Sequence, residues 1–169
     1  IIENSKLPVD SHLMISNPDD VAAEYGRAGS KSVTFHLEAS SNPAKTLEDI
    51  RATGARSCVG IKPATPVELL FDLADHADMF LIMTVEPGAG GQSFMHDMLP
   101  KVRTLRNLIT SRGWKQWIQV DGGITVGTIG AAAEAGADNF VAGSAVYKAD
   151  VPGDMVLELK RLAQSHYLN

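Results

Sequence analysis

The chain has 169 residues, of which 44% are hydrophobic and 21% are charged, and its net charge at pH 7 is −5. A chain of this length and balance can bury the core of one globular domain. The negative charge, without any block of basic residues, argues against nucleic acid as a partner. No apolar run approaches the roughly 20 residues that a membrane-spanning helix needs.

Cys58 is the only cysteine of the sequence, and it lies inside an apolar run. A single cysteine cannot support a disulfide framework, which favours a reducing compartment. We therefore expect a cytoplasmic protein, although an organelle stroma would satisfy the same argument. A catalytic thiol is the alternative role for Cys58, but buried cysteines mostly act as small hydrophobic residues.

Short apolar runs alternate with helical patterns along the whole chain. Asn17-Pro18 is a typical helix start, with Asn as the N-cap and Pro at the first helical position, and Gly29 suits the end of that helix. The same pattern recurs along the chain. The expected strands are 9–16, 32–38, 57–62, 78–85, 117–120 and 140–142, and the expected helices are 17–28, 43–53, 67–76, 95–111, 125–135 and 153–165.

Six strand–helix units in strict alternation predict a parallel sheet covered by helices. Two α/β architectures fit this order: a doubly wound open sheet and a (β/α) barrel. In a doubly wound dinucleotide-binding sheet the glycine fingerprint follows the first strand. Here glycine-rich turns follow the last three strands, at 88–91, 122–123 and 143. This favours the barrel, in which loops after late strands commonly bind phosphate.

Two of these turns, Gly88-Ala89-Gly90-Gly91 and Gly143-Ser144, resemble a phosphate cradle. Backbone N–H groups in such turns can surround an anion, and a helix N-terminus adds positive potential. The simpler interpretation is that glycine only permits tight turns between strand and helix. No lysine follows in the Walker position, so a nucleotide-binding P-loop is not indicated.

Asp121 follows a buried strand and precedes Gly122-Gly123, where a ligand can approach the main chain closely. Asp121 could transfer protons, bind a metal or cap a helix, but it lies too early to cap the helix expected near residue 125. His12, at the tip of another strand, could be structural or could pair with Asp121 as an imidazole–carboxylate metal site. His36 shares a strand face with Glu38 and could point into a barrel mouth.

Met14 and Met83 also lie near strand tips. Methionine usually fills a core, although a soft apolar cover over a reacting carbon would suit both residues. The remaining histidines fall in helical or loop positions, where we expect them to be solvated; these are His76, His96 and His166.

Five segments together resemble the ribulose-phosphate 3-epimerase family. They are HLM at 12–14, TFHLE at 34–38, MTVEPGAGGQSF at 83–94, VDGG at 120–123 and AGS at 142–144, and the likeness runs from about residue 9 to about residue 149 in family order. The resemblance implies a TIM (β/α)₈ barrel. It also implies an isomerase of the pentose phosphate pathway that interconverts D-ribulose 5-phosphate and D-xylulose 5-phosphate. Such an enzyme would use a divalent metal ion, zinc or iron, and two aspartates as its acid/base residues.

By position, the resemblance makes Asp121 a metal ligand and one of two acid/base residues, and it makes His12 a second metal ligand. Both would also contact the substrate, together with the two methionines and the glycine turns. Ala89 stands where the family usually has Phe, which would loosen packing over the substrate. The implied substrate-binding residues are His12, Met14, Met83, Gly88, Ala89, Gly90, Gly91, Asp121, Gly122, Gly123, Gly143 and Ser144.

The resemblance also implies that the chain starts just before the third strand of the family pattern. Residues 1–169 would then form one partial barrel domain with six of eight units, and the other acid/base aspartate and the remaining metal ligands would lie in the two missing units. We therefore expect this chain alone to be inactive. A shortened, non-catalytic relative that binds sugar phosphates or another chain is the alternative, and another phosphate-binding barrel enzyme, such as a decarboxylase, is a third. A sugar phosphate is the expected partner, and a homo-oligomer is left open.

Overall fold

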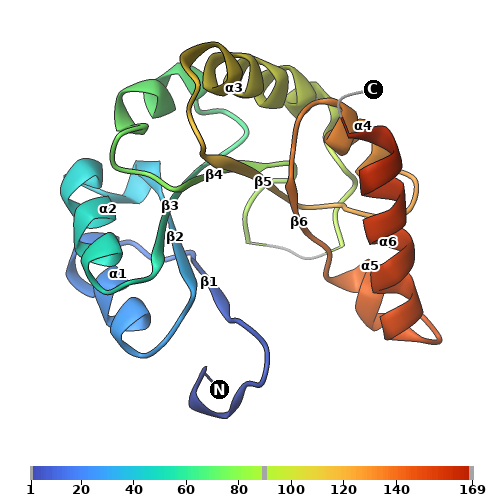
Figure 1. The fold of residues 1–169 in the computed structure, drawn as a ribbon, viewed down its shortest axis with the longest axis horizontal. Coiled ribbons are helices and arrows are strands. Elements are labelled where there is room, and N and C mark those ends of the chain that lie inside the picture. Colours follow the sequence, from blue (N-terminus) through green and yellow to red (C-terminus); the bar gives the residue numbers. More distant parts are fainter. Residues whose placement is uncertain (1, 89–90, 168–169) are drawn as a thin grey trace. The chain divides into compact units, whose positions relative to one another are not determined.

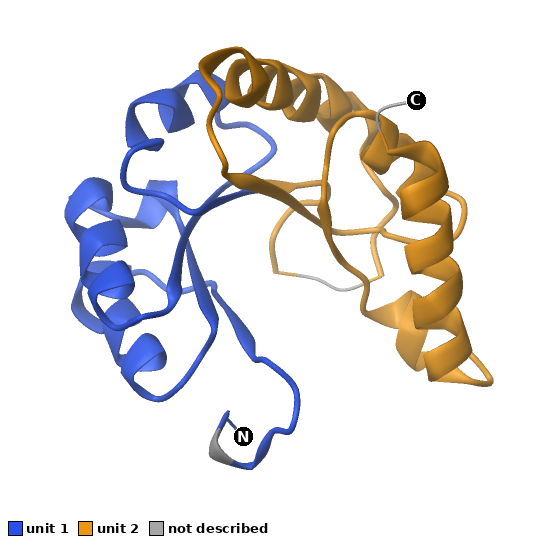
Figure 2. Ribbon diagram, in the orientation of Figure 1, with its two compact units in different colours: residues 1–81 blue, residues 82–169 orange. Residues whose placement is uncertain are grey.

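The computed structural model describes residues 2–88 and 91–167, in two compact units (Figures 1 and 2). Unit 1 comprises Ile1–Leu81, and unit 2 comprises Ile82–Asn169. Within the described residues the strands of the sheet follow the order of the sequence, from β1 to β6. This order is the one expected when each strand is joined to its neighbour by a right-handed helical crossover.

Unit 1 contains parallel strands whose pairing is continuous. β1 (Asp10–Leu13) pairs with β2 (Ser32–His36), which pairs with β3 (Arg56–Ile61). The helices of this unit are η1 (Ile2–Asn4), α1 (Pro18–Arg27), η2 (Leu37–Ala39), α2 (Pro43–Ala52) and the 3₁₀ helix η3 (Val67–Leu73). Helix α1 packs against β2, and α2 packs against β3.

Strand β4 (Met79–Met83) spans the boundary between the units, and β5 (Trp117–Asp121) pairs in parallel with β6 (Asn139–Val141). The helices of unit 2 are η4 (His96–Met98), α3 (Leu99–Arg112), α4 (Ile129–Glu134), α5 (Ser144–Tyr147) and α6 (Pro152–His166). Helix α4 packs on α6. No helix in the described part of the chain is long and apolar enough to cross a bilayer.

The predicted helix ends are confirmed where they depend on local chemistry. Asn17 and Asn42 occupy N-caps with proline directly after them, and the Asn42 side chain accepts a hydrogen bond from the Lys45 backbone N–H at 3.4 Å. The Asn17 side chain makes no such bond. Gly113 ends α3 in the left-handed conformation, with φ of 67°, which a residue with a Cβ adopts only with strain.

Two predicted elements are wrong. The segment 67–76 was expected to be a helix of the same kind as the others, but it forms the 3₁₀ helix η3 over Val67–Leu73. The hydroxyl of Thr65, just before it, donates to the Glu38 carboxylate. The strand expected over 32–38 ends at His36, so Glu38 lies in η2, not on a strand face with His36. Strand β2 is buried at every position, without alternating exposure.

Helix α4 starts at Ile129, later than the expected residue 125. The Thr128 hydroxyl donates to the Gly123 carbonyl at 2.8 Å, and the Thr125 backbone N–H donates to Thr128 Oγ1 at 2.9 Å. These bonds hold a turn where the helix was expected, because threonine side chains offer the backbone an alternative to helical bonding. The short helix α5 was not predicted.

The core of each unit consists of the strands and the inner faces of the helices. In unit 1 Phe35 and Ile50 are fully buried, and in unit 2 Leu105 and Val120 are fully buried. Burying a side chain of this kind stabilises the fold by roughly 1.5–3 kcal/mol. Cys58 is also fully buried, as predicted, and burial raises the pKa of its thiol, which makes it a poor nucleophile.

Candidate functional site

Asp121 is the last residue of β5 and is partly exposed, so its side chain lies at the carboxyl end of the strand. Gly122 and Gly123 follow with φ of 121° and 67°. A Cβ at Gly122 would lie 2.4 Å from a methyl group of Val85, and one at Gly123 would lie 2.6 Å from the Phe94 backbone nitrogen. The turn after Asp121 therefore needs both glycines, because it packs directly on the segment that follows β4.

Thr84 fixes this turn, and sequence reasoning missed it. Its backbone N–H donates to the Asp121 carbonyl at 2.8 Å, and its hydroxyl donates to the Gly122 carbonyl at 2.6 Å. The Thr84 carbonyl accepts from the Met95 N–H at 2.8 Å. These bonds place the Asp121 backbone without using its carboxylate. A buried threonine between Met83 and Val85 was the signal in the sequence, since a buried hydroxyl needs a partner.

The loop after β4 carries the predicted glycine turn. Gly88 and Gly91 have φ of 111° and 77°, and no atom lies within 4 Å of a Cβ built on either residue. Ala89 and Gly90, which were also predicted to bind substrate, lie outside the described residues. The Gln92 side chain donates to the Glu86 carbonyl at 2.6 Å. Gly88 and Gly91 therefore leave open space where a side chain would stand, and the predicted role of this turn in phosphate binding stays a prediction.

Gly143 and Ser144 follow β6 and are exposed. Gly143 is the N-cap of α5, with φ of −89°, and space around a Cβ built there is open within 4 Å. Gly143 is thus not required by a left-handed conformation or by tight packing. Its predicted role in binding phosphate is consistent with an accessible backbone, and it stays a prediction.

In unit 1 the structure brings His12 against His36. The Nε2 atoms of the two rings are 2.9 Å apart, the ring centroids are 5.0 Å apart, and the ring planes are inclined by 22°. The Nδ1 of His36 lies 3.5 Å from Glu38 Oε2. The side chain of His36 is 5% exposed, so it lies inside the unit and is not solvated like the exposed His96 and His166.

Burial and hydrogen bonding set the charge of these groups. Burial lowers the pKa of His36, and the neighbouring His12 lowers it further, against the opposing effect of Glu38. Partial burial opposes ionisation of Glu38, but hydrogen bonds from the Lys62 backbone N–H and the Thr65 hydroxyl outweigh it and lower the Glu38 pKa. At neutral pH the arrangement therefore contains a neutral imidazole beside a carboxylate.

The two predicted methionines differ in their surroundings. Met83 ends β4 and is 1% exposed, whereas Met14 follows β1 and is 51% exposed. Met83 therefore packs within the fold, and Met14 is accessible to a ligand. Their role as a cover over a reacting carbon stays a prediction.

The family model described as the ribulose-phosphate 3 epimerase family matches residues 1–147. This chain belongs to that family. The ribulose-phosphate 3-epimerase of Mycobacterium leprae is 48% identical over 163 residues, which cover 96% of this chain and 73% of the relative. The cytoplasmic isoform of ribulose-phosphate 3-epimerase from Oryza sativa subsp. japonica is 41% identical over 163 residues, which cover 94% of this chain and 70% of that protein.

Among solved structures, 3-hexulose-6-phosphate synthase from Salmonella typhimurium has a TM-score of 0.71 at 20% identity, covering 95% of this chain and 74% of that one. This likeness shows the fold alone, an α/β fold with a parallel sheet like that of TIM barrels. The predicted fold class is confirmed at this level, and the predicted isomerase family is confirmed by the epimerase relatives. The predicted number of missing units is not tested by these comparisons.

The metal pair predicted from the epimerase resemblance is divided between the units, with His12 in unit 1 and Asp121 in unit 2. Over residues 2–88 and 91–167, no group of three or more His, Cys, Asp or Glu side chains could hold a metal ion. Imidazole and carboxylate are nonetheless ligands that zinc and iron accept. The two residues fit the metal chemistry as individual ligands, and their pairing stays a prediction.

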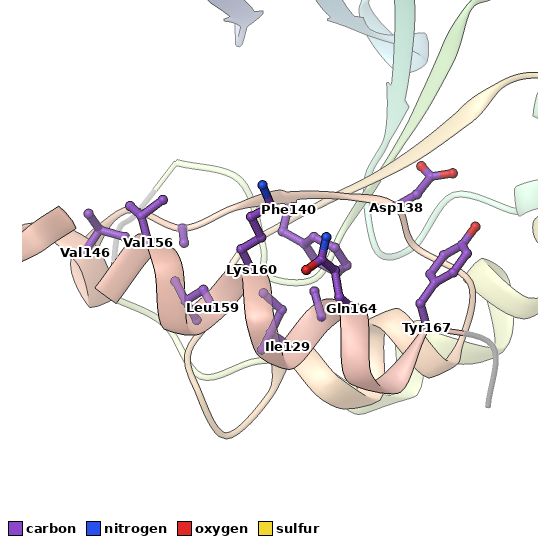
Figure 3. Close-up of a pocket in the computed structure, with 11 residues that line it drawn as sticks. Ile129, Asp138, Phe140, Val146, Val156, Leu159, Lys160, Gln164 and Tyr167 are labelled. Atoms are coloured by element: carbon purple, nitrogen blue, oxygen red, sulfur yellow. The ribbon is translucent and has the colours of Figure 1, made fainter. Parts of the chain in front are cut away.

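A cavity of about 580 Å³ lies in unit 2, between β6 and α6 (Figure 3). Its wall is mostly apolar, with Phe140 from β6 facing Leu159 and Lys160 of α6. Neither Asp121 nor any histidine lines it, so it is not the centre where an epimerase would transfer protons. The lining residues are Ile129, Asp138, Phe140, Ala142, Val146, Val156, Leu159, Lys160, Ala163, Gln164 and Tyr167.

Proposed function

We propose that this protein interconverts D-ribulose 5-phosphate and D-xylulose 5-phosphate by proton transfer at C3 through an enediolate. The observation that carries the proposal is the family match over residues 1–147, supported by epimerase relatives at up to about half identity. The substrate is therefore a sugar phosphate, and the reaction belongs to the pentose phosphate pathway. A nucleic-acid or membrane partner is not part of the proposal. The predicted cytoplasmic location and single domain stay predictions.

Asp121 is the proposed acid/base residue on one face of C3. Inversion at a carbon that bears an acidic proton requires one group to remove the proton and another to return a proton on the opposite face. The Asp121 side chain is partly exposed at the end of β5, and the bonds from Thr84 hold its backbone in place. A carboxylate carried on a backbone that is held in this way can accept the C3 proton without first reorganising the main chain.

Residues 1–169 on their own are proposed to be inactive. The chain offers Asp121 for one face of C3, and the family resemblance assigns the second aspartate to strand–helix units that would precede residue 1. A proton removed from one face could then only return to the same face, which regenerates the substrate. The upstream coding sequence tests this, because the proposal requires it to encode a second acid/base aspartate.

Zinc or iron is the proposed cofactor, with His12 and Asp121 as two of its ligands. Since the described residues include no cluster of three ligands, the remaining ligands are expected outside this set. A bound divalent ion would stabilise the negative charge of the enediolate oxygen. His12 and Asp121 would also orient the substrate through hydrogen bonds to its hydroxyl groups.

The phosphate group is proposed to lie against the glycine turns after β4 and β6, at Gly88–Gly91 and Gly143-Ser144. Gly88, Gly91 and Gly143 leave open space where a side chain would stand, so an anion can approach their backbone. Gly122 and Gly123 shape the turn beside Asp121. Met14 and Met83 are proposed to flank the substrate carbon chain, where a soft apolar surface limits water.

The test compares turnover of ribulose 5-phosphate, with added Zn²⁺ or Fe²⁺, in residues 1–169 and in the chain extended by its upstream coding sequence. Turnover is expected in the extended chain only. There, Asp121→Asn is expected to lower kcat/KM by at least about 100-fold, because a proton-transfer group is lost. Thermal unfolding should be unchanged. The matched control is Glu134→Gln, an exposed acid of α4, which should retain activity.

Three outcomes would refute parts of the proposal. An Asp121→Asn variant with more than about a tenth of the activity would show that Asp121 does not transfer the proton. An extended, folded chain without epimerase activity would overturn the proposed reaction itself. Activity of residues 1–169 alone would show that a second acid/base group is present within this chain.

A further inference from the structure

The cavity of about 580 Å³ in unit 2 is bounded by one face of a strand and one stripe of a helix (Figure 3). Asp138, Phe140 and Ala142 alternate along β6 and its two flanks, so their side chains share one face. The helix residues of the wall recur at intervals that place them on one side of α6. They are Val156, Leu159, Lys160, Ala163, Gln164 and, at the C-cap, Tyr167. The two surfaces would pack against each other in a filled layer, but here they are separated by the cavity.

Strand β6 is half-exposed although it carries Phe140 and Val141. Phe140 pairs in register with Val120 of β5, which is fully buried. Strand β4 is buried at every position, and β6 is buried at none. In the part of the chain that the structure describes, β5 has a strand on each side, whereas β6 has a strand on one side only. The exposure of β6 therefore follows from its open edge, where backbone N–H and C=O groups have no strand to bond.

Helix α6 has more apolar surface than β6 can cover. A helix with its side chains is about 10–12 Å wide and neighbouring strands are about 4.8 Å apart, so one helix covers about two strands. Across the cavity α6 faces β6 alone. Leu159 is 5% exposed, but Val156, one turn earlier on the same stripe, is 50% exposed. The position beside β6 is thus roofed by apolar side chains of α6 and bordered by an open strand edge.

We propose that this cavity receives a further β-strand, which pairs with the open edge of β6 and inserts apolar side chains between Phe140, Val156 and Leu159. The strand comes from the part of the protein that longer relatives have and residues 1–169 do not: the match covers 73% of the Mycobacterium leprae relative, which leaves about a quarter of it without a counterpart here. The inference rests on the proposed function, in which units encoded upstream complete the enzyme. The added strand should carry apolar residues at every second position at least, because one of its faces meets α6.

The shape of the cavity argues against a second copy of this chain as the occupant. In a symmetric dimer the same surface of both copies meets itself, and two hollow surfaces facing each other leave a void. A strand of a second copy inserted head to tail would fill the cavity, but it would leave the cavity of that copy open to a third one. Such an arrangement gives an open-ended assembly instead of a closed one. A strand of the same polypeptide fills the cavity without either consequence.

The test measures how fast a water-soluble thiol reagent labels a cysteine placed in the cavity wall. Cys58 is the only cysteine of the sequence and is fully buried, so the background is low. Val156→Cys is compared with Val126→Cys, because both valines are 50% exposed and Val126 lies outside the wall. Each variant is made in residues 1–169 and in the chain extended by its upstream coding sequence. We expect extension to slow labelling of Val156→Cys by at least about tenfold, since a thiol under a strand reacts only when the structure opens locally, and to leave Val126→Cys unchanged.

Equal labelling of Val156→Cys with and without the extension would overturn the proposal. So would a sedimenting dimer of residues 1–169 in which Val156→Cys is protected, because the occupant would then be a second copy. If a variant fails to fold, hydrogen exchange of the unsubstituted chains still decides. Extension should slow exchange of the amides at 139–141 relative to those at 32–36 in β2, which has strands on both sides. An unchanged ratio would contradict pairing at the edge of β6.

The added strand and the proposed function fail in different ways, because labelling and exchange do not depend on catalysis. An extended chain that protects Val156→Cys but has no epimerase activity would contradict the proposed function only. An extended chain that is an active epimerase but leaves Val156→Cys as reactive as in residues 1–169 would contradict the added strand only.

Discussion

Each unit contains an ion pair between a helix arginine and an aspartate that directly precedes a strand. In unit 1, Arg51 of α2 donates to the Asp75 carbonyl at 3.0 Å and to the Asp78 carboxylate at 2.9 Å. Asp78 also accepts from the Ser57 backbone N–H at 2.9 Å, at the start of β3. The pair therefore joins the end of a helix, a turn and the beginning of two strands.

Unit 2 repeats this scheme with different residues. Arg106 of α3 donates to the Gly136 carbonyl at 2.9 Å and to the Asp138 carboxylate at 2.5 Å. Asp138 accepts from the Ile118 backbone N–H at 2.8 Å, at the start of β5. The hydrogen bonds match those of unit 1 almost one for one, so the two pairs can be compared directly.

The pairs differ in burial, and this reverses the direction of the pKa shift. The side chains of Arg51 and Asp78 are 41% and 37% exposed, whereas those of Arg106 and Asp138 are 11% and 26% exposed. Partial burial raises the pKa of Asp78, but its hydrogen bonds from Ser57 and Arg51 outweigh this, so the pKa is lowered. Burial dominates at Asp138 and raises its pKa despite similar bonds. The same bonding scheme thus gives opposite shifts, because the cost of removing a charge from water grows with burial.

Gly136 explains why the Arg106–Asp138 pair is more buried than the Arg51–Asp78 pair. Gly136 has φ of 106°, and a Cβ there would lie 2.5 Å from Cγ of Arg106. The absence of a side chain lets the arginine stem lie directly against the turn. The burial of the Arg106–Asp138 pair is therefore linked to a backbone requirement at one position.

Removing each arginine should give the largest contrast between the units. Arg106→Met leaves the Asp138 carboxylate poorly solvated and without its cation, and we expect a loss of about 3 kcal/mol in the free energy of unfolding. Arg51→Met is the matched control in the more exposed pair, where such pairs contribute about 0–1 kcal/mol. Urea denaturation at pH 7 measures both. Equal losses would show that burial does not separate the two pairs.

The elements around these pairs were largely predictable from sequence. Proline after asparagine located the start of α2, and glycine located the end of α3, because both depend on neighbouring residues only. The 3₁₀ helix η3 was not predictable, since the Thr65 hydroxyl bonds Glu38, 27 residues earlier in the chain. The late start of α4 likewise depends on a side chain, that of Thr128, that bonds the backbone instead of continuing a helix.

In the candidate site, too, the features that depend on neighbouring residues could be predicted, and those that depend on distant contacts could not. The turn Asp121-Gly122-Gly123 was recognisable because an acid followed by two glycines after an apolar run is a local pattern. The hydrogen bonds from Thr84 to this turn could not be recognised in the sequence, because their acceptors lie 37 and 38 residues away in the chain. The contact between His12 and His36 required the strand register. The roles in proton transfer, metal binding and phosphate binding stay predictions.

Asp19 extends the comparison to an aspartate without an arginine. It accepts from the Ser40 hydroxyl at 2.5 Å, the Ser41 N–H at 2.8 Å and the Thr46 hydroxyl at 2.7 Å. Burial opposes its ionisation, but these bonds together outweigh it and hold the pKa of Asp19 well below the usual range. We expect Asp19→Asn to lower the free energy of unfolding at pH 7 by about 1–2 kcal/mol. The adjacent, exposed Asp20→Asn should have no effect, and similar losses in both variants would show that the hydrogen bonds to Asp19 do not matter.

The smallest effect, and the sharpest test of the comparison, is the pH dependence of the two pairs. The folded-state pKa of Asp78 is lowered, so its contribution is present above the unfolded value of about 3.9 and is lost as the pH falls through the folded-state pKa. The folded-state pKa of Asp138 is raised, so the folded state binds the proton more tightly. Its contribution therefore decreases as the pH rises from about 3.9 through the raised pKa.

Asp78→Asn and Asp138→Asn should consequently change the pH profile in opposite directions. Urea denaturation between about pH 3 and pH 7 gives the free energy of unfolding of each variant relative to the unsubstituted protein, over the range in which carboxylates titrate. The deficit of Asp78→Asn should shrink as the pH falls, and that of Asp138→Asn should grow. Because asparagine retains an oxygen that can accept the strand N–H, the variants test the charge and not the loss of that bond. Profiles with the same sign would show that burial of the Arg106–Asp138 pair does not outweigh its hydrogen bonds.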